Sequence, residues 1–187
     1  MYITEATLNK LEQKYGVPSV LHTAYQMNAR EFDLLKWSMR DGRAHDVTLF
    51  IFQGARVAVI RKPSYVPGLY RVPSGGIKPG ECFEVGAKRE AYEETGLDVE
   101  LERYLLKVFV TFSFQGEVVT WTSHVFSAQA IGGHLQPVDT KEIDGARWAT
   151  VDELKTTLLT SLQQSASAGL RYRAELQAKT IACMEER

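Results

Sequence analysis

The sequence has few cysteines. Of its 187 residues, Cys82 and Cys183 are the two cysteines. Two cysteines do not make the disulfide framework of a small secreted domain, and no cysteine and histidine cluster has the spacing of a zinc site. We therefore expect two reduced thiols, and neither a disulfide-stapled scaffold nor a structural zinc centre.

The sequence also lacks an excess of charge of either sign and lacks a long apolar run. Its formal net charge is −1, so no overall field attracts a nucleic acid polymer or an anionic membrane. No apolar stretch approaches the roughly 20 residues that a membrane-spanning helix needs. The segment MYITEATLNK has neither the basic region nor the apolar region of a signal peptide. We expect a cytoplasmic protein, and no partner that is a nucleic acid polymer or a membrane.

No internal repeat or low-complexity block is present, and the length predicts a single domain over residues 1–187. Two segments near the N-terminus have helical patterns. TEATLNKLEQKYG begins with threonine and ends with glycine, and AREFDLLKWSMRDG carries Phe32, Leu35 and Met39 at helical spacing. We expect a helical N-terminal extension over residues 1–45, which either covers the core or supplies a homodimer contact.

After the extension, strand and helix patterns alternate. VTLFIF and VAVIRK predict one hairpin, VFVTFSF and VVTWTSHVF a second, and GARWAT a short last strand. LYRVPSGGIKPGE is dense in turn formers and predicts a loop before a helix over residues 83–95. VDELKTTLL and AGLRYRAELQAKTIACMEE predict two further helices. These elements indicate an α/β fold with a mixed sheet between helical layers, a core over residues 46–160 and a C-terminal helix over residues 161–187.

The stretch REAYEETG crowds Glu90, Glu93 and Glu94 into the last turn of the predicted helix. Like charges three or four residues apart cost roughly 0.2–0.5 kcal/mol per pair, and the helix dipole disfavours negative charge at this end. A bound divalent cation would relieve the repulsion, because such ions take oxygen ligands. Without metal, replacing Glu94 by glutamine should then leave the protein no less stable. The competing interpretation is an acidic helix end in solvent.

The flanking residues favour the first interpretation. From Gly75 to Leu97 the chain reads GGIKPGECFEVGAKREAYEETGL. Its glycines, charged residues and apolar residues match the Nudix box at nine specified positions: Gly75, Glu81, Arg89, Glu90, Ala91, Glu93, Glu94, Gly96 and Leu97. The chain resembles the Nudix hydrolase family, and this resemblance implies a Nudix-type α/β/α sandwich with a mixed sheet.

The resemblance also implies a metal site for Mg²⁺ or Mn²⁺. A fourth carboxylate joins the box, because Glu142 lies six residues before Trp148, where similar proteins use a glutamate as metal ligand or general base. Glu117 is the rival candidate. The predicted metal ligands are Glu90, Glu93, Glu94 and Glu142, and the predicted catalytic residues are Arg89, Glu90, Glu94 and Glu142.

Two further expectations concern how the box is held together. The resemblance implies that Glu81 and Arg89 pair and orient the loop against the helix. Gly86 lies four residues before Glu90 on the same helix face. We expect the absent side chain at Gly86 to leave room for the Glu90 carboxylate.

The activity implied by the resemblance is hydrolysis of a nucleoside diphosphate linked to another group, such as a nucleotide sugar, ADP-ribose, a dinucleoside polyphosphate or a (d)NTP. The candidate phosphate-binding residues beside the box are Arg71, Gly75, Gly76 and Lys78. Aromatic side chains that could stack on a base are Tyr70, Phe112, Phe114 and Trp121. The alternatives are a nucleotide-binding or regulatory module without catalysis, and an isomerase on the same scaffold.

Overall fold

The computed structural model describes residues 2–186. Its helices are α1 (Glu5–Tyr15), α2 (Ala29–Ser38), α3 (Phe83–Thr95), α4 (Val151–Lys155), α5 (Thr157–Gln163) and α6 (Ala168–Glu185), with a 3-10 turn at Arg40–Gly42. Its strands are β1 (Ser19–Gln26), β2 (His45–Gln53), β3 (Arg56–Arg61), β4 (Ser74–Gly76), β5 (Leu97–Phe114), β6 (Glu117–Gly133) and β7 (Gly145–Thr150). No helix in this range is both long and apolar enough to cross a membrane.

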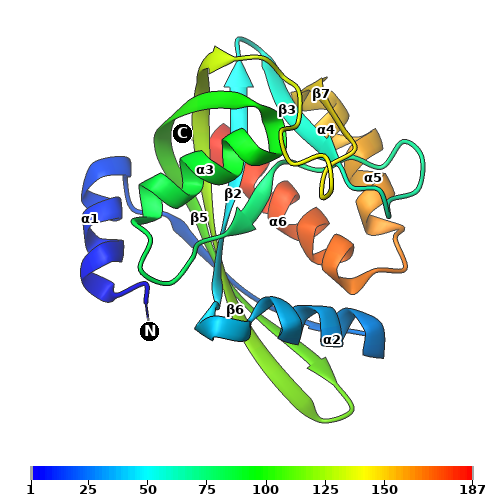
Figure 1. The fold of residues 1–187 in the computed structure, drawn as a ribbon. Helices are drawn as coiled ribbons and strands as arrows, with labels where there is room; N and C mark the ends of the chain where they lie inside the picture. Colours follow the sequence, from blue (N-terminus) through cyan, green and yellow to red (C-terminus); the bar gives the residue numbers. More distant parts are fainter. Residues whose placement is uncertain (1, 187) are drawn as a thin grey trace.

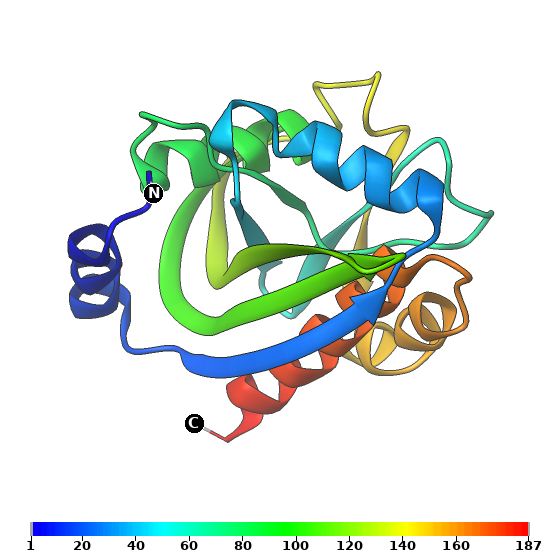
Figure 2. The ribbon, with the colours of Figure 1, turned by 90° about the horizontal axis from the view of Figure 1, so that it is seen from below.

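The strands form one mixed sheet in the order β1-β5-β6-β2-β3-β7, and the short β4 pairs with β2 (Figure 1). β1 runs parallel to β5 and β2 runs parallel to β6, whereas the β2–β3, β5–β6, β3–β7 and β2–β4 pairs are antiparallel. Both predicted hairpins and the predicted short last strand are therefore confirmed. β5 and β6 are long and strongly curved, and they bend around the inner strands (Figure 2).

Helices cover both faces of the sheet, as the α/β/α prediction requires. On one face α1 and α3 bury Leu11 and Phe83 against alternate β2 residues, among them Leu49. On the other face α4, α5 and α6 pack against residues such as Phe50, the next position of the same strand. Because successive side chains of a strand point to opposite faces, β2 serves both cores and is almost wholly buried.

The N-terminal extension differs from the expected pair of helices, because a strand, β1, lies between α1 and α2. Its segment SVLHTAYQ alternates between half-buried and exposed side chains and forms one edge of the sheet. Half of its side chains are polar and no apolar run marks it, so the sequence pattern did not reveal it.

The predicted division of the chain at residues 45 and 160 stays a prediction. The last helix begins at Ala168, and the segment predicted as a single helix before it is interrupted at Thr156.

The predicted helix over residues 83–95 is confirmed by α3, which ends at Thr95 with Gly96 as its C-cap. Gly96 has φ of 72°, in the left-handed region that glycine adopts without strain. A Cβ at this position would lie 2.3 Å from the carbonyl oxygen of Gln136 and 2.6 Å from that of His134. Gly96 is therefore required by conformation and by space, and it turns the chain from α3 directly into β5.

A buried polar group crosses the sheet beneath α3. The His124 ring is hydrogen-bonded to Tyr104 (2.5 Å) and to His45 (3.0 Å), and it is fully buried. Burial lowers the pKa of His124 to about 3 and also lowers the pKa of His45. His124 is thus held neutral, and its role is to satisfy two polar neighbours in the core, consistent with the lack of a functional motif around it.

We expect this histidine to make the fold sensitive to acid. In the unfolded chain His124 takes up a proton below pH of about 6.5, but the folded chain binds that proton only near pH 3. Stability is therefore lost as the pH falls below 6.5, and His124→Gln removes this loss. Between pH 7.5 and 5.5 the stability deficit of the variant should shrink by about 1 kcal/mol. Urea unfolding of both proteins, with the exposed His134→Gln as control, measures this difference, and a deficit independent of pH would contradict it.

Candidate functional site

The loop before α3 is tied to the helix by one arginine. Arg89 donates from Nε to Glu81 Oε1 (2.7 Å) and from Nη2 to Glu81 Oε2 (2.9 Å) and to the carbonyl oxygen of Gly76 (3.2 Å). Glu81 also accepts from the backbone N–H of Lys78 (3.0 Å). These charge-assisted bonds lower the pKa of Glu81. The predicted Glu81–Arg89 pair is confirmed, and it fixes the position of the loop on α3.

The same guanidinium also gathers two of the predicted metal ligands. Its Nη1 donates to Glu90 Oε1 (2.6 Å) and to Glu93 Oε2 (2.9 Å). Glu90 is 13% exposed and Glu93 is 40% exposed. Burial raises the pKa of Glu90 to about 7, although Arg89 opposes this shift. The repulsion inferred from the sequence is therefore reduced by an arginine that stands between these carboxylates.

Glu90 lies directly against the glycine loop. A Cβ placed on Gly75 would lie 1.8 Å from Glu90 Oε2, so no residue with a side chain fits there unless Glu90 moves. The expectation for Gly86 is wrong in its detail. The space beside Gly86 is taken by Glu81 Oε2, 2.6 Å from the position of a Cβ, and by Ile77. The close approach of Glu90 thus depends on Gly75, and Gly86 makes room for Glu81.

Glu94 differs from its two neighbours because it is buried, with 4% of its side chain exposed. It accepts from the backbone N–H of Ser74 (2.6 Å) and from Nη2 of the equally buried Arg71 (3.4 Å). Arg71 further donates to Tyr65 Oη (2.9 Å) and to the Val72 carbonyl oxygen (2.8 Å). Burial raises the pKa of Glu94, and the Arg71 charge opposes the shift. The picture of Glu94 as a bare charge in a repulsive cluster is therefore wrong.

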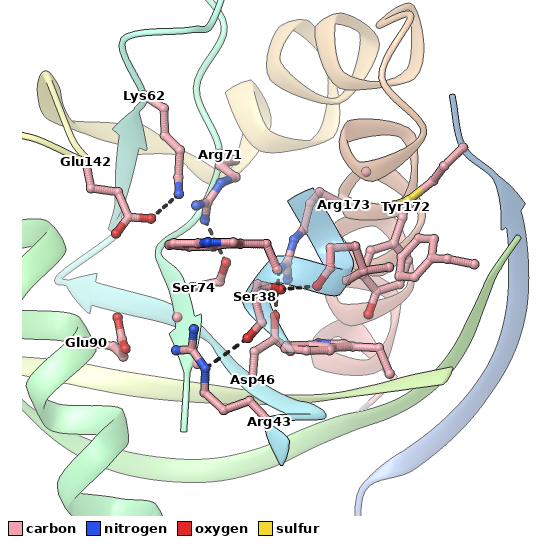
Figure 3. A pocket seen from close by; sticks show the side chains of 18 residues that line it. Ser38, Arg43, Asp46, Lys62, Arg71, Ser74, Glu90, Glu142, Tyr172 and Arg173 are labelled. Carbon is pink, nitrogen blue, oxygen red and sulfur yellow. Dashed lines mark hydrogen bonds and ion pairs between the residues drawn. The ribbon is translucent and has the colours of Figure 1, made fainter. Parts of the chain in front are cut away.

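A cavity of about 400 Å³ opens beside this loop (Figure 3). One end carries the predicted box and loop residues together with polar neighbours: Lys62, Arg71, Ser74, Gly75, Gly76, Glu90 and Glu142. The other end is formed by α2, the start of β2, β6 and α6. Figure 3 shows Glu90 and Glu142 on one side of the cavity and Tyr172 and Arg173 on the other.

The remaining predicted residues fall inside and outside this cavity. Glu142 lines it and forms an ion pair with Lys62. Its rival Glu117 is 66% exposed, pairs with Lys36 (3.0 Å) and is not among the described lining residues. Lys78 is exposed on the loop and also lies outside the described cavity wall.

The aromatic candidates divide in the same way. Phe112 and Trp121 line the cavity. Phe114 packs instead on Phe32, with ring centroids 6.0 Å apart, and Tyr70 lies under the Arg147 guanidinium. Phe114 lies on the same face of β5 as Phe112 but two residues further on, at the end of the strand, and Tyr70 lies in the loop between β3 and β4.

The cavity residues that were not predicted from the sequence include Trp37, Arg43, Asp46 and Arg173. They come from α2, from the segment before β2, from β2 itself and from α6, outside the box. Each is a single residue without a motif, and the topology alone brings them together. The sequence carried no signal that could have found them.

The carboxylates of the box suit a hard cation in part. Among residues 2–186 no group of three or more histidine, cysteine, aspartate or glutamate side chains is already arranged as a metal site. Glu90 and Glu93, however, each direct an oxygen at the same positively charged nitrogen of Arg89. Carboxylate oxygens are the ligands that Mg²⁺ prefers. Glu90 Oε2 and Glu93 Oε1 are not bonded to Arg89, so these two carboxylates fit a divalent cation, whereas the Glu94 carboxylate is engaged by Arg71 and Ser74.

Comparisons with known proteins identify the family. The family model described as NUDIX domain matches residues 42–170. NAD-capped RNA hydrolase NudC of Stutzerimonas stutzeri (strain A1501) is 29% identical over 106 residues, which cover 57% of this chain and 36% of that protein. Oxidized purine nucleoside triphosphate hydrolase of Mus musculus is 31% identical over 118 residues, which cover 62% of this chain and 71% of that protein. The chain spans about a third of the length of the first curated relatives it matches.

Solved structures show the same fold. A NUDIX hydrolase from Nitrosomonas europaea matches with a TM-score of 0.51 and 20% identity, over 71% of this chain and 86% of the other. The E. coli ORF135 protein matches with a TM-score of 0.51 and 20% identity, over 77% and 92%. The family model spans the complete box and most of the cavity wall. This chain belongs to the NUDIX domain family.

Proposed function

We propose that this protein is a metal-dependent hydrolase that cleaves the diphosphate linkage of a nucleoside diphosphate derivative. The observation that carries the proposal is the Glu90 carboxylate, which is mostly buried against Gly75 at the wall of a cavity that also holds Lys62 and Arg71. Burial raises the pKa of this carboxylate in spite of its Arg89 partner, and carboxylates perturbed in this way concentrate at functional sites. The relatives named above as hydrolases of nucleotide compounds support the same chemistry.

Mg²⁺ or Mn²⁺ is the proposed cofactor, and Glu90 and Glu93 are its proposed protein ligands. Family members typically use divalent metal ions. A bound ion of this kind neutralises charge on the phosphate oxygens and stabilises the leaving phosphate. Glu94 and Glu142 are the other two metal ligands predicted from the sequence. In the structure Glu94 binds Arg71 and Ser74, and Glu142 pairs with Lys62, so we propose other roles for them.

The side chains of the cavity account for binding and proton transfer. Lys62 stands at the cavity wall and can contact a phosphate oxygen when its partner Glu142 turns towards water. Glu142 is half exposed and acts as the proposed general base, taking a proton from water at a carboxylate oxygen. Arg89 is a positioning residue, since its contacts are with Glu81, Glu90, Glu93 and the loop. Arg71 holds Glu94 and Ser74 in place at the cavity wall.

The expected substrate class and the expected location remain part of the proposal, and the range of substrates is extended. A small-molecule nucleotide remains the proposed substrate and the cytoplasm the proposed location. The relatives include hydrolases named for NAD-capped RNA, so an RNA-linked nucleotide belongs among the substrates to be tested. All glutamates of the box are present, and no observation favours a binding module without catalysis.

A substrate panel tests the proposed function. ADP-ribose, diadenosine polyphosphates, NTPs, dNTPs, nucleotide sugars, NADH and an NAD-capped oligoribonucleotide are incubated with Mg²⁺ or Mn²⁺, and the products are identified by chromatography. At least one diphosphate linkage should be cleaved, and Glu90→Gln should lower kcat/KM at least ~10²-fold. Glu100→Gln, an exposed carboxylate on β5, is the control. Turnover restricted to phosphomonoesters would refute the proposal.

The general base has a prediction of its own. Glu142→Gln should lower kcat by ~10²-fold while KM changes little, because a proton acceptor is lost and the cavity keeps its shape. Glu117→Gln is the matched control, since its carboxylate also pairs with a lysine but lies outside the described cavity wall. Steady-state kinetics on the best substrate of the panel measure both. Full activity of Glu142→Gln would assign the proton transfer to a box residue.

Two neighbouring glutamates should affect the metal-free protein in opposite directions. The folded-state pKa of Glu90 is raised to about 7, so its stabilising contribution is lost as the pH rises from 4.5 through 7. At pH 8 Glu90→Gln should therefore raise the melting temperature. Glu94→Gln leaves the buried Arg71 guanidinium without its counter-charge and should cost about 3 kcal/mol.

Thermal melts in EDTA at pH 5 and pH 8 measure both effects. The gain for Glu90→Gln should be smaller at pH 5 than at pH 8, because Glu90 is then largely protonated in the wild type. Melting temperatures that fall by the same amount in both variants would contradict the distinct environments of the two carboxylates.

A further inference from the structure

The cavity extends past the proposed diphosphate end to a second wall, which we call the distal wall: Trp37, Asp46, Phe112, Trp121, Tyr172 and Arg173. Its residues come from α2, β2, β5, β6 and α6 (Figure 3). Four of the six side chains are aromatic, and the remaining two are oppositely charged. The proposed hydrolysis of a diphosphate uses none of them.

The carboxylate of the distal wall is incompletely paired. Asp46 is buried, with 4% of its side chain exposed, and its Oδ2 accepts from Arg173 Nη2 (2.6 Å). Within residues 2–186, Asp46 Oδ1 has no hydrogen-bond partner. Buried polar atoms are almost always hydrogen-bonded, so an unpaired one in a cavity wall calls for an explanation. Asp46 lines the cavity, and a ligand that presents an N–H group there would satisfy this buried oxygen once the carboxylate turns towards the ligand.

The arginine beside it offers donors. Arg173 bonds to Thr48 Oγ1 (2.9 Å) and to Asp46, and these contacts occupy two of the five N–H groups of a guanidinium. Its side chain is 20% exposed and lines the cavity. Asp46 and Arg173 therefore form a hydrogen-bonded pair at the cavity wall that combines an acceptor with donors.

Strand register places this pair next to the glycine loop. Asp46 is opposite Gly76, and Val47 is opposite Gly75, in the antiparallel pairing of β2 with β4. Opposite residues of an antiparallel pair have Cα atoms about 5 Å apart. A ligand whose phosphates lie against Gly75 and Gly76 thus brings its adjoining groups to the distal wall.

We propose that the distal wall is the nucleobase subsite of this enzyme, with Asp46 and Arg173 pairing with the edge of the base and Trp121 contacting its face. A nucleobase edge carries a donor beside an acceptor, which complements this pair, and its flat ring suits an aromatic wall. The assignment rests on the proposed function for the identity of the ligand. It gives the N-terminal extension a role, because α2 supplies Trp37 to the same wall.

Binding measurements test the subsite without any hydrolysis. AMP, GMP, CMP, UMP, ribose 5-phosphate and inorganic pyrophosphate are titrated into the metal-free protein by NMR, with the tryptophan indole N–H signals as reporters. At least one nucleotide should bind ~10-fold more tightly than ribose 5-phosphate. Equal affinities for nucleotides and ribose 5-phosphate would show that the base adds nothing to binding, and this result would overturn the proposal.

Asp46→Asn replaces the unpaired acceptor while keeping the shape of the side chain. It should lower the affinity for the preferred nucleotide at least ~10-fold and leave that for pyrophosphate within about twofold. Glu175→Gln is the matched control, because this α6 carboxylate binds Thr23 and Tyr25 and lies outside the described cavity wall. Unchanged nucleotide affinity in Asp46→Asn, or an equal loss in Glu175→Gln, would overturn the assignment.

The wild-type titration keeps the proposal testable even if Asp46→Asn does not fold. The outcomes also separate this inference from the proposed activity. Base-dependent binding that needs Asp46, without cleavage of any compound in the substrate panel, would refute the hydrolase and support the subsite. Cleavage of a compound in the panel, together with nucleotide binding that does not depend on the base, would support the hydrolase and refute the subsite.

Discussion

The Arg89 guanidinium is the contact on which the rest of the site depends. It joins the loop to α3 through Glu81 and Gly76, and it holds Glu90 and Glu93 through a single nitrogen. Arginine suits this task because its five donors are fixed in one plane and its charge persists at every working pH. The crowded carboxylates are thereby kept together by the protein's own positive charge, and they are directed towards one point.

The three glutamates of REAYEETG are alike in the sequence and different in the structure. Glu93 is partly exposed on α3, and Glu90 packs against Gly75. Glu94 is buried beneath the loop, where it pairs with Arg71. Helix periodicity could predict that they share one end of α3, and the spacing of the box could predict their association with the loop. Neither pattern could predict Arg71 as the partner of Glu94, because that contact depends on how the loop before β4 folds back.

The strands of the sheet could also be predicted only in part from the sequence. β2, β3 and β7 were predictable because their apolar runs or short alternating patterns are bounded by turn residues. β1 was not, since SVLHTAYQ forms an edge strand whose side chains are half-buried or exposed and whose composition is half polar. Asp46 and Arg173 are 127 residues apart in the chain, and their pairing is a consequence of packing α6 across β2. The box, by contrast, is contiguous, and its chemistry could therefore be inferred from the order of its residues alone.

The cavity unites the contiguous and the dispersed parts of the site. The box and its loop supply the end with Glu90, and α2, β2, β5, β6 and α6 supply the distal wall. The central proposal is that Glu90 and Glu93 hold a divalent cation beside the Arg89 guanidinium, through the oxygens that are not bonded to Arg89. Diffraction from a crystal soaked in Mn²⁺, using the anomalous signal of the ion, tests this directly. The account predicts a Mn²⁺ peak at the carboxylates of Glu90 and Glu93, with the Glu81–Arg89 pair intact; a peak elsewhere in the cavity, or none at α3, would contradict it.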